Sequence, residues 1–399
     1  MRVRIDKGIA NGVIQAPASK SMAHRLLISA GLSEGKSIIR GISKCQDVLA
    51  TIDCLEALGV KTEINGSDII VYGINMRNAK PNMRLECRES GSTLRFMLPI
   101  AMLSGNASVL HGAEDLMKRP MSIYEELFSD SYHKEAETIT VKGPLKSGEY
   151  TILGNVSSQF VSGLIFALPL LDNDSIIKIT PPIESRSYIN LTISAVKKFG
   201  IVVDWLDNNT LSIKGNQTYK ACDVSIEGDY SGAAFFDALN FLGGSVLVQG
   251  LDADSIQGDK IYKKLFNQLS KESVTININD CPDLAPILFC VAAAKHGGTF
   301  CGTKRLKIKE SDRAETMAEE LRKFGTTVTV NDDSVVVAPA DFHAPNVAIC
   351  GHNDHRVVMS LAVLLTLTSG EIDGAEAISK SYPDFFSDLR RLGIGVEEI

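Results

Sequence analysis

The chain has 399 residues and a formal net charge of −7. Hydrophobic residues make up 44% and charged residues 22%, a balance typical of a globular protein long enough for two or three domains. An acidic chain has no general affinity for nucleic acid or acidic membranes, so we expect neither as a partner. A cluster of cations in such a chain does not follow from its overall charge, and it is therefore informative about a local site.

The eight cysteines include no Cys-x-x-Cys pair, and the histidines complete no metal-ligand pattern, so we expect reduced thiols and no bound metal. The N-terminal segment MRVRIDKGIANGVIQAPASKS lacks the apolar stretch of a signal peptide. The apolar runs GLIFALPLL and VVMSLAVLLTLTSG are shorter than the ~18 residues that a membrane-spanning helix needs. We therefore expect a cytoplasmic protein in which these runs form buried helices.

In chain order, small hydroxyl or glycine residues followed by polar or cationic residues precede an apolar helix at five places. These are PASKSMAHR from residue 17, ESGSTLR from 89, GNVSSQF from 154, KIKESDR from 307 and NDHRVVMS from 353. Helix capping explains the hydroxyl groups, but the partial positive charge of a helix N-terminus disfavours the Lys and Arg residues by up to ~1 kcal/mol. If several of these helix ends converge, they form a site for a substrate with several phosphate or carboxylate groups.

The fourth of these helices has the best-defined ends. Asp312 and Glu315 form a capping-box pair, and Gly325 stands where a C-terminal cap belongs. Lys309 and Arg313 flank the N-terminal end, where an anion bound among them would account for their charge. The alternative is a solvated run of charges on a surface helix.

A phrase made of a helix end, a glycine and an alternating strand recurs four times, as ALGVKTEI, KFGIVVDW, KFGTTVTV and RLGIGVEE. The four glycines, Gly59, Gly200, Gly325 and Gly393, are spaced at one or two multiples of roughly 60–70 residues. This spacing indicates six degenerate helix–strand units in an α/β or α+β architecture, although a chance recurrence is an alternative. The polar segment FSDSYHKEAETITVKGPLKSGEY is expected to be a loop with one short strand.

Three groups are candidates for moving protons. Glu310 lies beside Lys309, His355 follows Asp354, and Asp283 lies in INDCPDLAP. Asp283 would serve equally well as a helix cap, and His355 as a structural histidine. The chain contains no Walker A, G-x-G-x-x-G or G-x-S-x-G motif, which disfavours nucleotide kinases, dehydrogenases and α/β-hydrolases.

Together these motifs resemble the 5-enolpyruvylshikimate-3-phosphate (EPSP) synthase family, the 3-phosphoshikimate 1-carboxyvinyltransferases. The matching pieces occur in family order from residue 17 to 386: PASKSMAHR, ESGSTLR, MKRPM, GNVSSQF, ESRSY, EGDYSGAAFF, CPDLAP, KIKESDR, NDHRVVMS and SKSYPDFF. The resemblance implies an α/β (α+β) fold of two similar domains, each an inside-out α/β barrel of three βαβαββ units, with the active site in the interdomain cleft. It assigns residues 15–227 to a shikimate 3-phosphate domain, and 1–14 with 228–399 to a domain carrying most phosphoenolpyruvate ligands.

The resemblance also implies the reaction. The enolpyruvyl group of phosphoenolpyruvate moves to the 5-hydroxyl of shikimate 3-phosphate through a tetrahedral intermediate, and phosphate is released. We expect a monomer in the shikimate pathway of aromatic amino acid biosynthesis, with these two small molecules as partners and neither a metal nor an organic cofactor. Fixed positive charge would offset the repulsion between the two anionic substrates.

Motif matching supplies the expected site residues. The expected catalytic residues are Asp283 as base, Glu310 as acid, Lys20 as a further proton-transfer group and His355 nearby. The expected shikimate 3-phosphate ligands are Lys20, Ser21, Arg25, Ser157, Ser158, Gln159, Ser185, Asp283 and Lys309. The expected phosphoenolpyruvate ligands are Lys20, Gly91, Arg119, Gln159, Arg313, Arg356 and Lys380.

The chain departs from the common family pattern at several positions, among them Glu89 and Arg305. Glu89 replaces the Asn of the frequent NAGT motif, and Arg305 stands where an Asn often contacts shikimate 3-phosphate. One alternative function is that of a UDP-N-acetylglucosamine enolpyruvyl transferase, which uses a loop cysteine for which Cys87 is the only suggestive candidate. Another is a non-catalytic binder of a polyanionic metabolite, which would need the cations but not the proton-moving groups.

Overall fold

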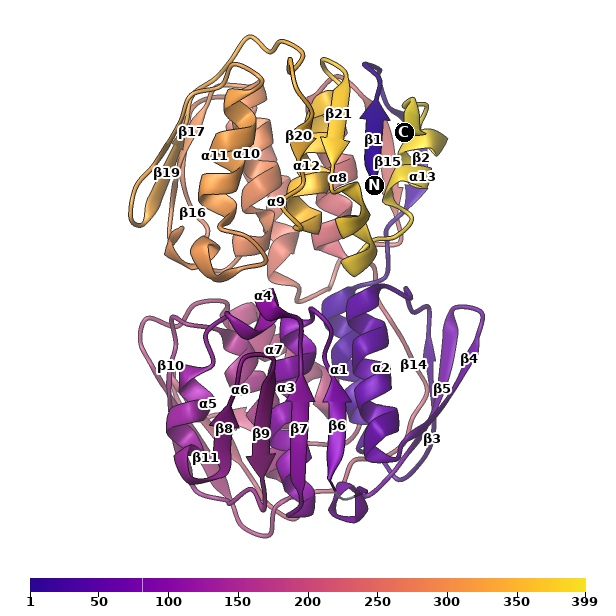
Figure 1. Cartoon of the computed structure of the whole chain (residues 1–399), viewed down its shortest axis with the longest axis vertical. Helices are drawn as coiled ribbons and strands as arrows, with labels where there is room; N and C mark the ends of the chain where they lie inside the picture. Colours follow the sequence, from indigo (N-terminus) through magenta and orange to yellow (C-terminus); the bar gives the residue numbers. More distant parts are fainter. Residues whose placement is uncertain (81) are drawn as a thin grey trace. The chain divides into compact units, whose positions relative to one another are not determined.

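The computed structural model describes residues 1–80 and 82–399, which form two compact units (Figure 1). One unit comprises Lys20–Ile226, and we call it the N unit. The other comprises Met1–Ser19 and Glu227–Ile399, and we call it the C unit. The chain therefore passes from one unit to the other twice, after Ser19 and after Ile226.

The N unit repeats one strand and helix pattern three times. The most regular repeat runs β10 (Glu149–Leu153), α6 (Ser158–Ala167), β11 (Ser175–Thr180), α7 (Arg186–Lys198), β12 (Val203–Trp205) and β13 (Thr210–Ile213). β10 and β11 are parallel, and β13 pairs antiparallel with both β11 and β12, so the sheet order is β10-β11-β13-β12. This is a βαβαββ unit of the kind that the family resemblance implied.

A second repeat forms the sheet β6-β7-β9-β8. It runs β6 (Met83–Glu86), α3 (Gly91–Ala101), β7 (Ala107–His111), α4 (Glu114–Met117), α5 (Ser122–Leu127), β8 (Tyr132–Lys134) and β9 (Thr138–Lys142). The prediction of a loop with one short strand is wrong here, because β8 and β9 form an antiparallel hairpin that continues the sheet. Ile139 and Val141 alternate into the core, whereas β8 is too short and polar to show a strand pattern.

The third repeat of the N unit combines segments from both of its ends. It contains α1 (Lys20–Gly31), β3 (Gly35–Arg40), α2 (Gln46–Leu58), β4 (Lys61–Asn65), β5 (Asp68–Gly73) and β14 (Val224–Ser225). The sheet order β14-β3-β5-β4 repeats the pattern of the other two, with the last strand of the unit in first position. The pairing of β14 with β3 thus joins the two ends of the N unit.

The C unit contains two complete repeats. One runs β16 (Val274–Asn277), α10 (Ala285–Ala294), β17 (Gly298–Cys301), α11 (Arg313–Arg322), β18 (Val328–Val330) and β19 (Ser334–Val337). The other runs β20 (Ile349–Cys350), α12 (His355–Leu365), β21 (Gly370–Asp373), α13 (Phe385–Arg391), β22 (Val396–Glu398) and β1 (Arg2–Ile5). β1 lies between β21 and β22, so the N-terminal strand completes a sheet of C-terminal strands (Figure 1).

The last repeat of the C unit is incomplete, which corrects the expectation of three full units in each domain. It runs β2 (Asn11–Gln15), α8 (Tyr230–Phe241), β15 (Ser245–Gln249) and α9 (Tyr262–Leu269). Within the described part of the chain, no hairpin separates α9 from β16, and the sheet has two strands. The side chain of Asn240 instead bonds both backbone groups of Val246 in β15, at 2.8 Å and 2.6 Å.

The recurring pattern of a helix end, a glycine and a strand has the same local structure at all four places. Gly59, Gly200, Gly325 and Gly393 all have positive φ, between 83° and 110°, which glycine adopts without strain. The strands that follow them are β4, β12, β18 and β22, each the third strand of its repeat. The phrase therefore marks the same point in four structural units, which favours the repeat interpretation over chance.

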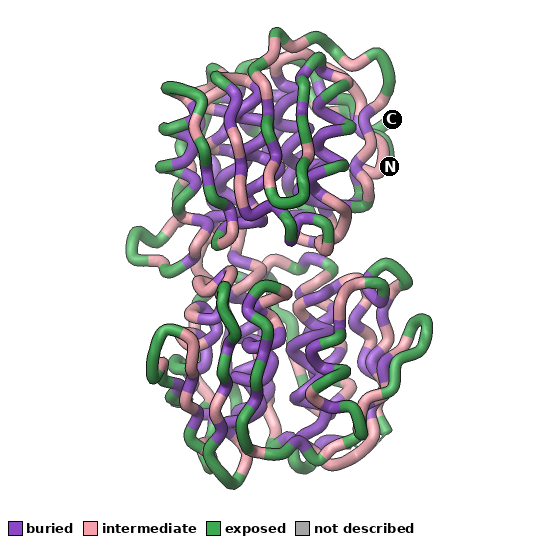
Figure 2. Tube along the Cα trace, turned by 90° about the vertical axis from the view of Figure 1, so that its left-hand side faces the viewer, coloured by how far each residue is buried: buried purple, intermediate pink, exposed green. Residues whose placement is uncertain are grey.

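Helices form the interior of each unit. In α3 and α6 of the N unit, and in α10 and α12 of the C unit, nearly every residue is buried. Helices that are apolar on all sides are buried on all sides, so the sheets flank them and the units have separate cores (Figure 2). Short 3-10 helices of the described residues include η1 (Met76–Asn78), η2 (Met102–Ser104), η3 (Ser129–Ser131), η4 (Leu168–Leu170), η5 (Gly258–Ile261) and η7 (Lys304–Ile308).

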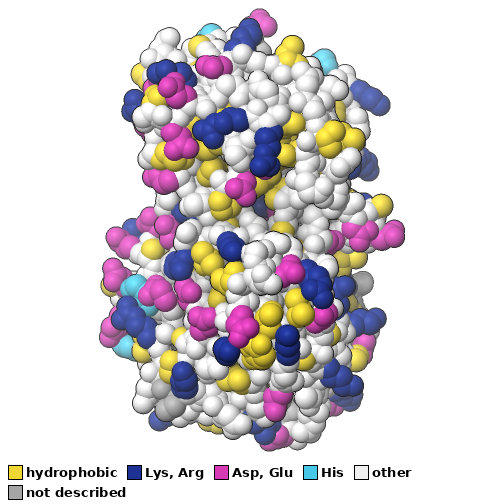
Figure 3. Space-filling view, turned by 90° about the vertical axis from the view of Figure 1, so that its right-hand side faces the viewer, with side chains coloured by type: hydrophobic (Ala, Val, Ile, Leu, Met, Phe, Trp, Pro, Cys, Tyr) yellow, Lys and Arg dark blue, Asp and Glu magenta, His cyan; other side chains and the backbone are white. Residues whose placement is uncertain are grey.

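The surface of each unit mixes both signs of charge. On the face shown in Figure 3, acidic and basic side chains alternate, with hydrophobic side chains between them. Neither sign forms a continuous field on that face, in keeping with the modest net charge. Among residues 1–80 and 82–399, no helix has both the length and the apolar character that crossing a membrane requires.

Candidate active site

Asp283 is the centre of a cluster of charges in the C unit. It lies in the 3-10 helix η6 (Pro282–Leu284), and its Oδ1 accepts hydrogen bonds from Lys309 Nζ at 3.1 Å and Arg313 Nη1 at 2.9 Å. Its Oδ2 accepts from Arg356 Nη2 at 3.1 Å. The alternative role of Asp283 as a helix cap is not observed, because α10 begins after Leu284 without a side-chain cap.

The neighbouring cations decide the protonation state of Asp283. Burial on its own would raise the pKa of this carboxyl group, but the charges of Arg356, Lys309 and Arg313 outweigh burial and hold the pKa well below its usual value. Burial lowers the pKa of the Lys309 ammonium, and the charge of Asp283 opposes that effect. Asp283 is therefore a carboxylate at neutral pH, able to accept a proton.

Arg313 occupies the first position of α11, with 1% of its side chain exposed. Besides Asp283, its guanidinium group donates to Asp354 Oδ2 at 2.8 Å and to Glu310 Oε2 at 2.6 Å. Burial lowers the pKa of Arg313, but these carboxylates raise it by more. Carboxylates of the protein itself thus balance the cation at this helix N-terminus, and the backbone N–H of Glu315 bonds Asp312 as the capping box predicts.

The N-terminus of α12 belongs to the same cluster. Asp354 is fully buried and caps the helix by accepting the backbone N–H of Arg356 at 2.9 Å. His355 and Arg356 are both buried in the first turn. Lys380 ends the 3-10 helix η8 (Ala375–Lys380), and its ammonium donates to the carbonyl of Asn353 at 2.6 Å. The C-unit cluster therefore consists of Lys309, Arg313, Arg356 and Lys380 with Asp283, Glu310, Asp354 and His355.

In the N unit, Lys20 begins α1 and forms an ion pair with Asp47. Lys20 Nζ lies 2.7 Å from Asp47 Oδ2, and the two side chains are only 16% and 13% exposed. Asp47 lies in the first turn of α2, where a helix N-terminus stabilises negative charge. This pair holds the Lys20 ammonium at the junction of two helix ends.

A chain of buried hydrogen bonds ties α1, α2 and α3 together beside Lys20. His24 Nδ1 lies 2.7 Å from Thr51 Oγ1, which lies 2.7 Å from Thr93 Oγ1, which donates to Ser90 Oγ at 2.8 Å. Burial and the charges of Lys20 and Arg25 hold the pKa of His24 well below its usual value, so the ring is neutral. These hydrogen bonds therefore connect three helices without adding charge.

Two guanidinium groups approach the backbone of Gly91 at the start of α3. A Cβ atom at this position would lie 3.1 Å from Nη1 of both Arg119 and Arg95. Arg95 Nη1 also donates to Gln159 Oε1 at 2.6 Å, and Gln159 Nε2 donates to Ser92 Oγ at 2.9 Å. Gln159 thus links α6 to the N-terminus of α3, and the absence of a side chain at Gly91 keeps the space between the cations open.

Arg25 lies one turn along α1 and is buried against α7. Its Nε donates to Thr192 Oγ1 at 2.8 Å, and its terminal nitrogens donate to the carbonyls of Tyr188 and Ser21 at 3.1 Å and 2.6 Å. Burial lowers the pKa of Arg25 to about 10, which leaves the guanidinium charged at neutral pH. Backbone carbonyls and a hydroxyl group hold this charge, and none of these three partners is anionic.

The expected serines lie at helix starts in the N unit. Ser157 caps α6 by accepting the backbone N–H of Gln159 at 3.3 Å, so the interpretation as a cap is confirmed. Ser158 is buried in the first turn of α6. Ser185 precedes α7 with φ of 56°, a left-handed conformation that is uncommon for serine. Residues with such strained backbone conformations often occur at functional sites.

The structure distributes the expected residues between the units. The N unit holds Lys20, Ser21, Arg25, Gly91, Arg119, Ser157, Ser158, Gln159 and Ser185, and the C unit holds Asp283, Lys309, Glu310, Arg313, His355, Arg356 and Lys380. Three further residues take part that motif matching had not assigned, namely Asp47, Arg95 and Asp354. Arg95 and Asp354 stand inside the motifs ESGSTLR and NDHR, whereas no sequence signal pointed to Asp47.

The chain is similar in sequence to known proteins over nearly its whole length. The family profile described as EPSP synthase (3-phosphoshikimate 1-carboxyvinyltransferase) matches residues 6–389. The chain belongs to the EPSP synthase family. Relatives named 3-phosphoshikimate 1-carboxyvinyltransferase, from Clostridium kluyveri and Clostridium beijerinckii, are 39% and 38% identical over 99% and 98% of this chain and 98% and 97% of their own.

The fold gives a second, independent comparison. A solved structure of EPSP synthase from Acinetobacter baumannii superposes with a TM-score of 0.79 at 22% identity and covers 100% of both chains. The predicted α/β fold with two domains is thereby confirmed. The prediction that the chain is an enzyme of this family is confirmed by the relatives.

Proposed function

We propose that the chain transfers the enolpyruvyl group of phosphoenolpyruvate to the 5-hydroxyl of shikimate 3-phosphate and releases phosphate. Membership of the EPSP synthase family supports the reaction. The observation that carries the proposal is the Asp283 carboxylate, held ionised by three cations in a partly buried cluster. Fixed charge of this kind stabilises anionic reactants and a base at the same place.

In the first step, Asp283 accepts the proton of the 5-hydroxyl group of shikimate 3-phosphate. The oxygen of that hydroxyl group attacks C2 of phosphoenolpyruvate. Glu310 donates a proton to the methylene carbon, and a tetrahedral intermediate forms. In the second step, the bond between C2 and the phosphate oxygen breaks and phosphate leaves, while the Glu310 carboxylate takes back a methyl proton and the double bond is restored. Lys20 and His355 are assigned to assist these proton transfers.

Ligand binding would make both Asp283 and Glu310 bind a proton more readily. Asp283 with its cations is a weak base, because those charges hold its pKa low. An anionic reactant that bonds Arg313 or Arg356 would neutralise part of this charge and make Asp283 more basic. The same anion would compete with Glu310 for Arg313 and favour the protonated form that an acid needs.

We take the substrate ligands from the motif matches. We assign to shikimate 3-phosphate Lys20, Ser21, Arg25, Ser157, Ser158, Gln159, Ser185, Asp283 and Lys309. We assign to phosphoenolpyruvate Lys20, Gly91, Arg119, Gln159, Arg313, Arg356 and Lys380. Buried Arg25 near the start of α7 supports the first set, and the two guanidinium groups at Gly91 support the second.

The test is a phosphate-release assay with phosphoenolpyruvate and one of three acceptors: shikimate 3-phosphate, UDP-N-acetylglucosamine or none. We expect release only with shikimate 3-phosphate. Release with the nucleotide sugar instead would identify the related transferase. Tight binding of both substrates without any release would favour the non-catalytic binder.

The structure disfavours both alternatives. Cys87, the only suggestive counterpart of a reactive loop cysteine, is fully buried directly after β6, with its thiol 3.8 Å from the carbonyl of Leu85. A simple binder would not need the Asp283 carboxylate, since a carboxylate among the cations repels an anionic ligand. We further propose a cytoplasmic monomer, which cell fractionation and analytical ultracentrifugation would test.

A further inference from the structure

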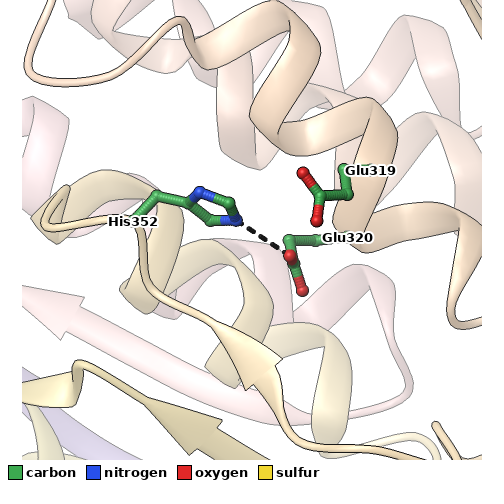
Figure 4. Close-up of side chains that lie close together, drawn as sticks. All are labelled: Glu319, Glu320 and His352. Atoms are coloured by element: carbon green, nitrogen blue, oxygen red, sulfur yellow. Dashed lines mark hydrogen bonds and ion pairs between the residues drawn. The ribbon is translucent and has the colours of Figure 1, made fainter.

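Glu320, near the C-terminal end of α11, is a fully buried carboxylate outside the proposed substrate contacts. Its oxygens accept hydrogen bonds from Lys323 Nζ at 2.8 Å and 2.9 Å and from the backbone N–H of Cys350 at 3.0 Å. His352 Nε2 lies 2.8 Å from its Oε1 (Figure 4). Burial would raise the pKa of Glu320, but these partners lower it, so the group is charged.

The cluster contains groups that could bind a metal ion. Potential ligand atoms of Glu319, Glu320 and His352 lie within 4.8 Å of one another, and Figure 4 shows all three side chains converging. However, the Lys323 ammonium contacts both oxygens of Glu320 and already supplies the balancing positive charge. The contacts to Lys323 and the Cys350 backbone therefore favour a structural connection over a metal site.

The connection leads to a strained turn. His352 and Asn353 lie between β20 and α12 with φ of 49° and 53°, so two consecutive residues other than glycine adopt the left-handed conformation. Such residues are unfavourable and persist where surrounding contacts hold them. The contacts of Glu320 with the Cys350 backbone and the His352 ring hold the first half of this turn.

The second half of the turn belongs to the C-unit cluster. The Asn353 carbonyl accepts the Lys380 ammonium, and Asp354 bonds Arg313 while capping the helix that carries Arg356. A change of φ at His352 would therefore move the acceptor of Lys380 and the cap below Arg356. Both cations are among the proposed ligands of phosphoenolpyruvate.

Helix α11 contacts this turn at two points. Arg313 at its start bonds Asp354, and Glu320, two turns further along the same helix, bonds Cys350 and His352. One rigid helix thus fixes the segment from Cys350 to Asp354 at both of its ends. Without the Glu320 contacts, α11 would hold the Asp354 end alone, and the Cys350 end would depend on its backbone pairing with β21.

We propose that Glu320 is a positioning residue: through His352 and the Cys350 backbone it holds the strained turn so that Lys380 and Arg356 face phosphoenolpyruvate. This inference rests on the proposed function of the C-unit cluster. Glu320 is not among the proposed substrate ligands. Its loss should therefore weaken phosphoenolpyruvate binding selectively, and should leave the groups that hold shikimate 3-phosphate in the N unit unchanged.

The test compares steady-state kinetics of the full-length wild type with Glu320→Ala, Glu320→Gln and His352→Ala. We expect KM for phosphoenolpyruvate to rise about tenfold in Glu320→Ala and His352→Ala, with KM for shikimate 3-phosphate changed less than about twofold and a smaller fall in kcat. Glu320→Gln keeps an oxygen acceptor for the Cys350 N–H and should recover part of the loss. His352 is partly exposed, so its variant should fold even if Glu320→Ala does not.

Leu321→Ala is the matched control, because Leu321 is buried on the same helix and its truncation loosens α11 without touching the turn. A selective rise in KM for phosphoenolpyruvate in this control would show that general destabilisation is sufficient and would overturn the proposal. Unchanged KM in folded Glu320→Gln and His352→Ala would overturn it as well. Absence of activity in the wild type would instead refute the proposed reaction, so the two failures are distinguishable.

Discussion

The charges around Asp283 neutralise one another before any ligand arrives. Lys309, Arg313 and Arg356 each bond this carboxylate, and Arg313 bonds two more carboxyl groups. Cations that are buried without partners would be costly, so the carboxylates keep them in place until a substrate anion competes for them. A polyanionic substrate can compete for several of these bonds at once.

The effect of adding one methyl group at Gly91 can be predicted. In Gly91→Ala the new Cβ would lie 3.1 Å from a nitrogen of Arg119 and of Arg95, so these guanidinium groups must shift away. We expect KM for phosphoenolpyruvate to rise roughly tenfold, with KM for shikimate 3-phosphate little changed. Steady-state kinetics with each substrate varied would measure both constants, and an unchanged KM for phosphoenolpyruvate would remove Gly91 from that site.

Glu320 gives a prediction for pH. Its folded-state pKa lies below the usual value of 4.5, so its contribution to stability is present above that value and is lost as the pH falls through the folded-state pKa. The difference in unfolding free energy between wild type and Glu320→Gln should therefore be largest at neutral pH and shrink in acid. Urea unfolding between about pH 7 and about pH 3 would show this, and a difference independent of pH would contradict the ionised state.

At the scale of helices, the N unit relies on a neutral chain of hydrogen bonds. Thr51 on α2 connects His24 on α1 to Thr93 on α3, and the Lys20 and Gly91 positions lie at the ends of these helices. In Thr51→Val the shape is preserved, but His24 and Thr93 each lose a buried partner. We expect a loss of about 1–3 kcal/mol in unfolding free energy.

Urea unfolding of Thr51→Val would measure this loss against Thr151→Val as a control. Thr151 is exposed on β10 of the same unit, so its replacement should change stability by less than about 0.5 kcal/mol. Equal effects in the two variants would show that the hydrogen-bonded chain has no special role.

The sequence predicted the helix starts well because each combines a local cap with an apolar pattern. Asp312, Ser157 and Asp354 all cap their helices, and the helices follow where expected. The hairpin β8–β9 was missed because three residues of β8 show no alternation. The shortened repeat after α9 could not be recognised, because a missing hairpin leaves no residues to interpret.

The site was predictable where its residues belong to motifs. Asp283, Glu310 and Arg313 come from two segments and meet as expected, although Asp283 could have been a cap. Asp47 was not predictable, because its role depends on the packing of α2 against α1 and not on any local pattern. The contact of Glu320 with His352 likewise joins positions 32 residues apart and is visible only in the structure.

At the scale of the whole molecule, the two units differ in how the chain builds them. The N unit is one continuous segment with its own core, and β14 closes it by pairing with β3. The C unit needs the N-terminal strands β1 and β2 to complete its sheets. The N unit should therefore be able to fold alone, whereas residues 227–399 lack two of their strands.

Expression of residues 20–226 alone would test this difference. We expect a single cooperative urea transition and no phosphate release, because Asp283 and the other C-unit residues are absent. A segment comprising 227–399 should not show a cooperative transition without residues 1–19. An unfolded 20–226 segment would contradict the assignment of a self-sufficient core.

Asp283 is proposed to accept the substrate proton within its group of cations. The most direct measurement is single-turnover phosphate release by Asp283→Asn, with binding of both substrates measured by calorimetry and Asp280→Asn as the exposed neighbouring control. We expect retained binding and a rate about 10²–10⁴ times lower for Asp283→Asn, with a normal rate for the control. A rate for Asp283→Asn close to that of the wild type would show that Asp283 is not the base.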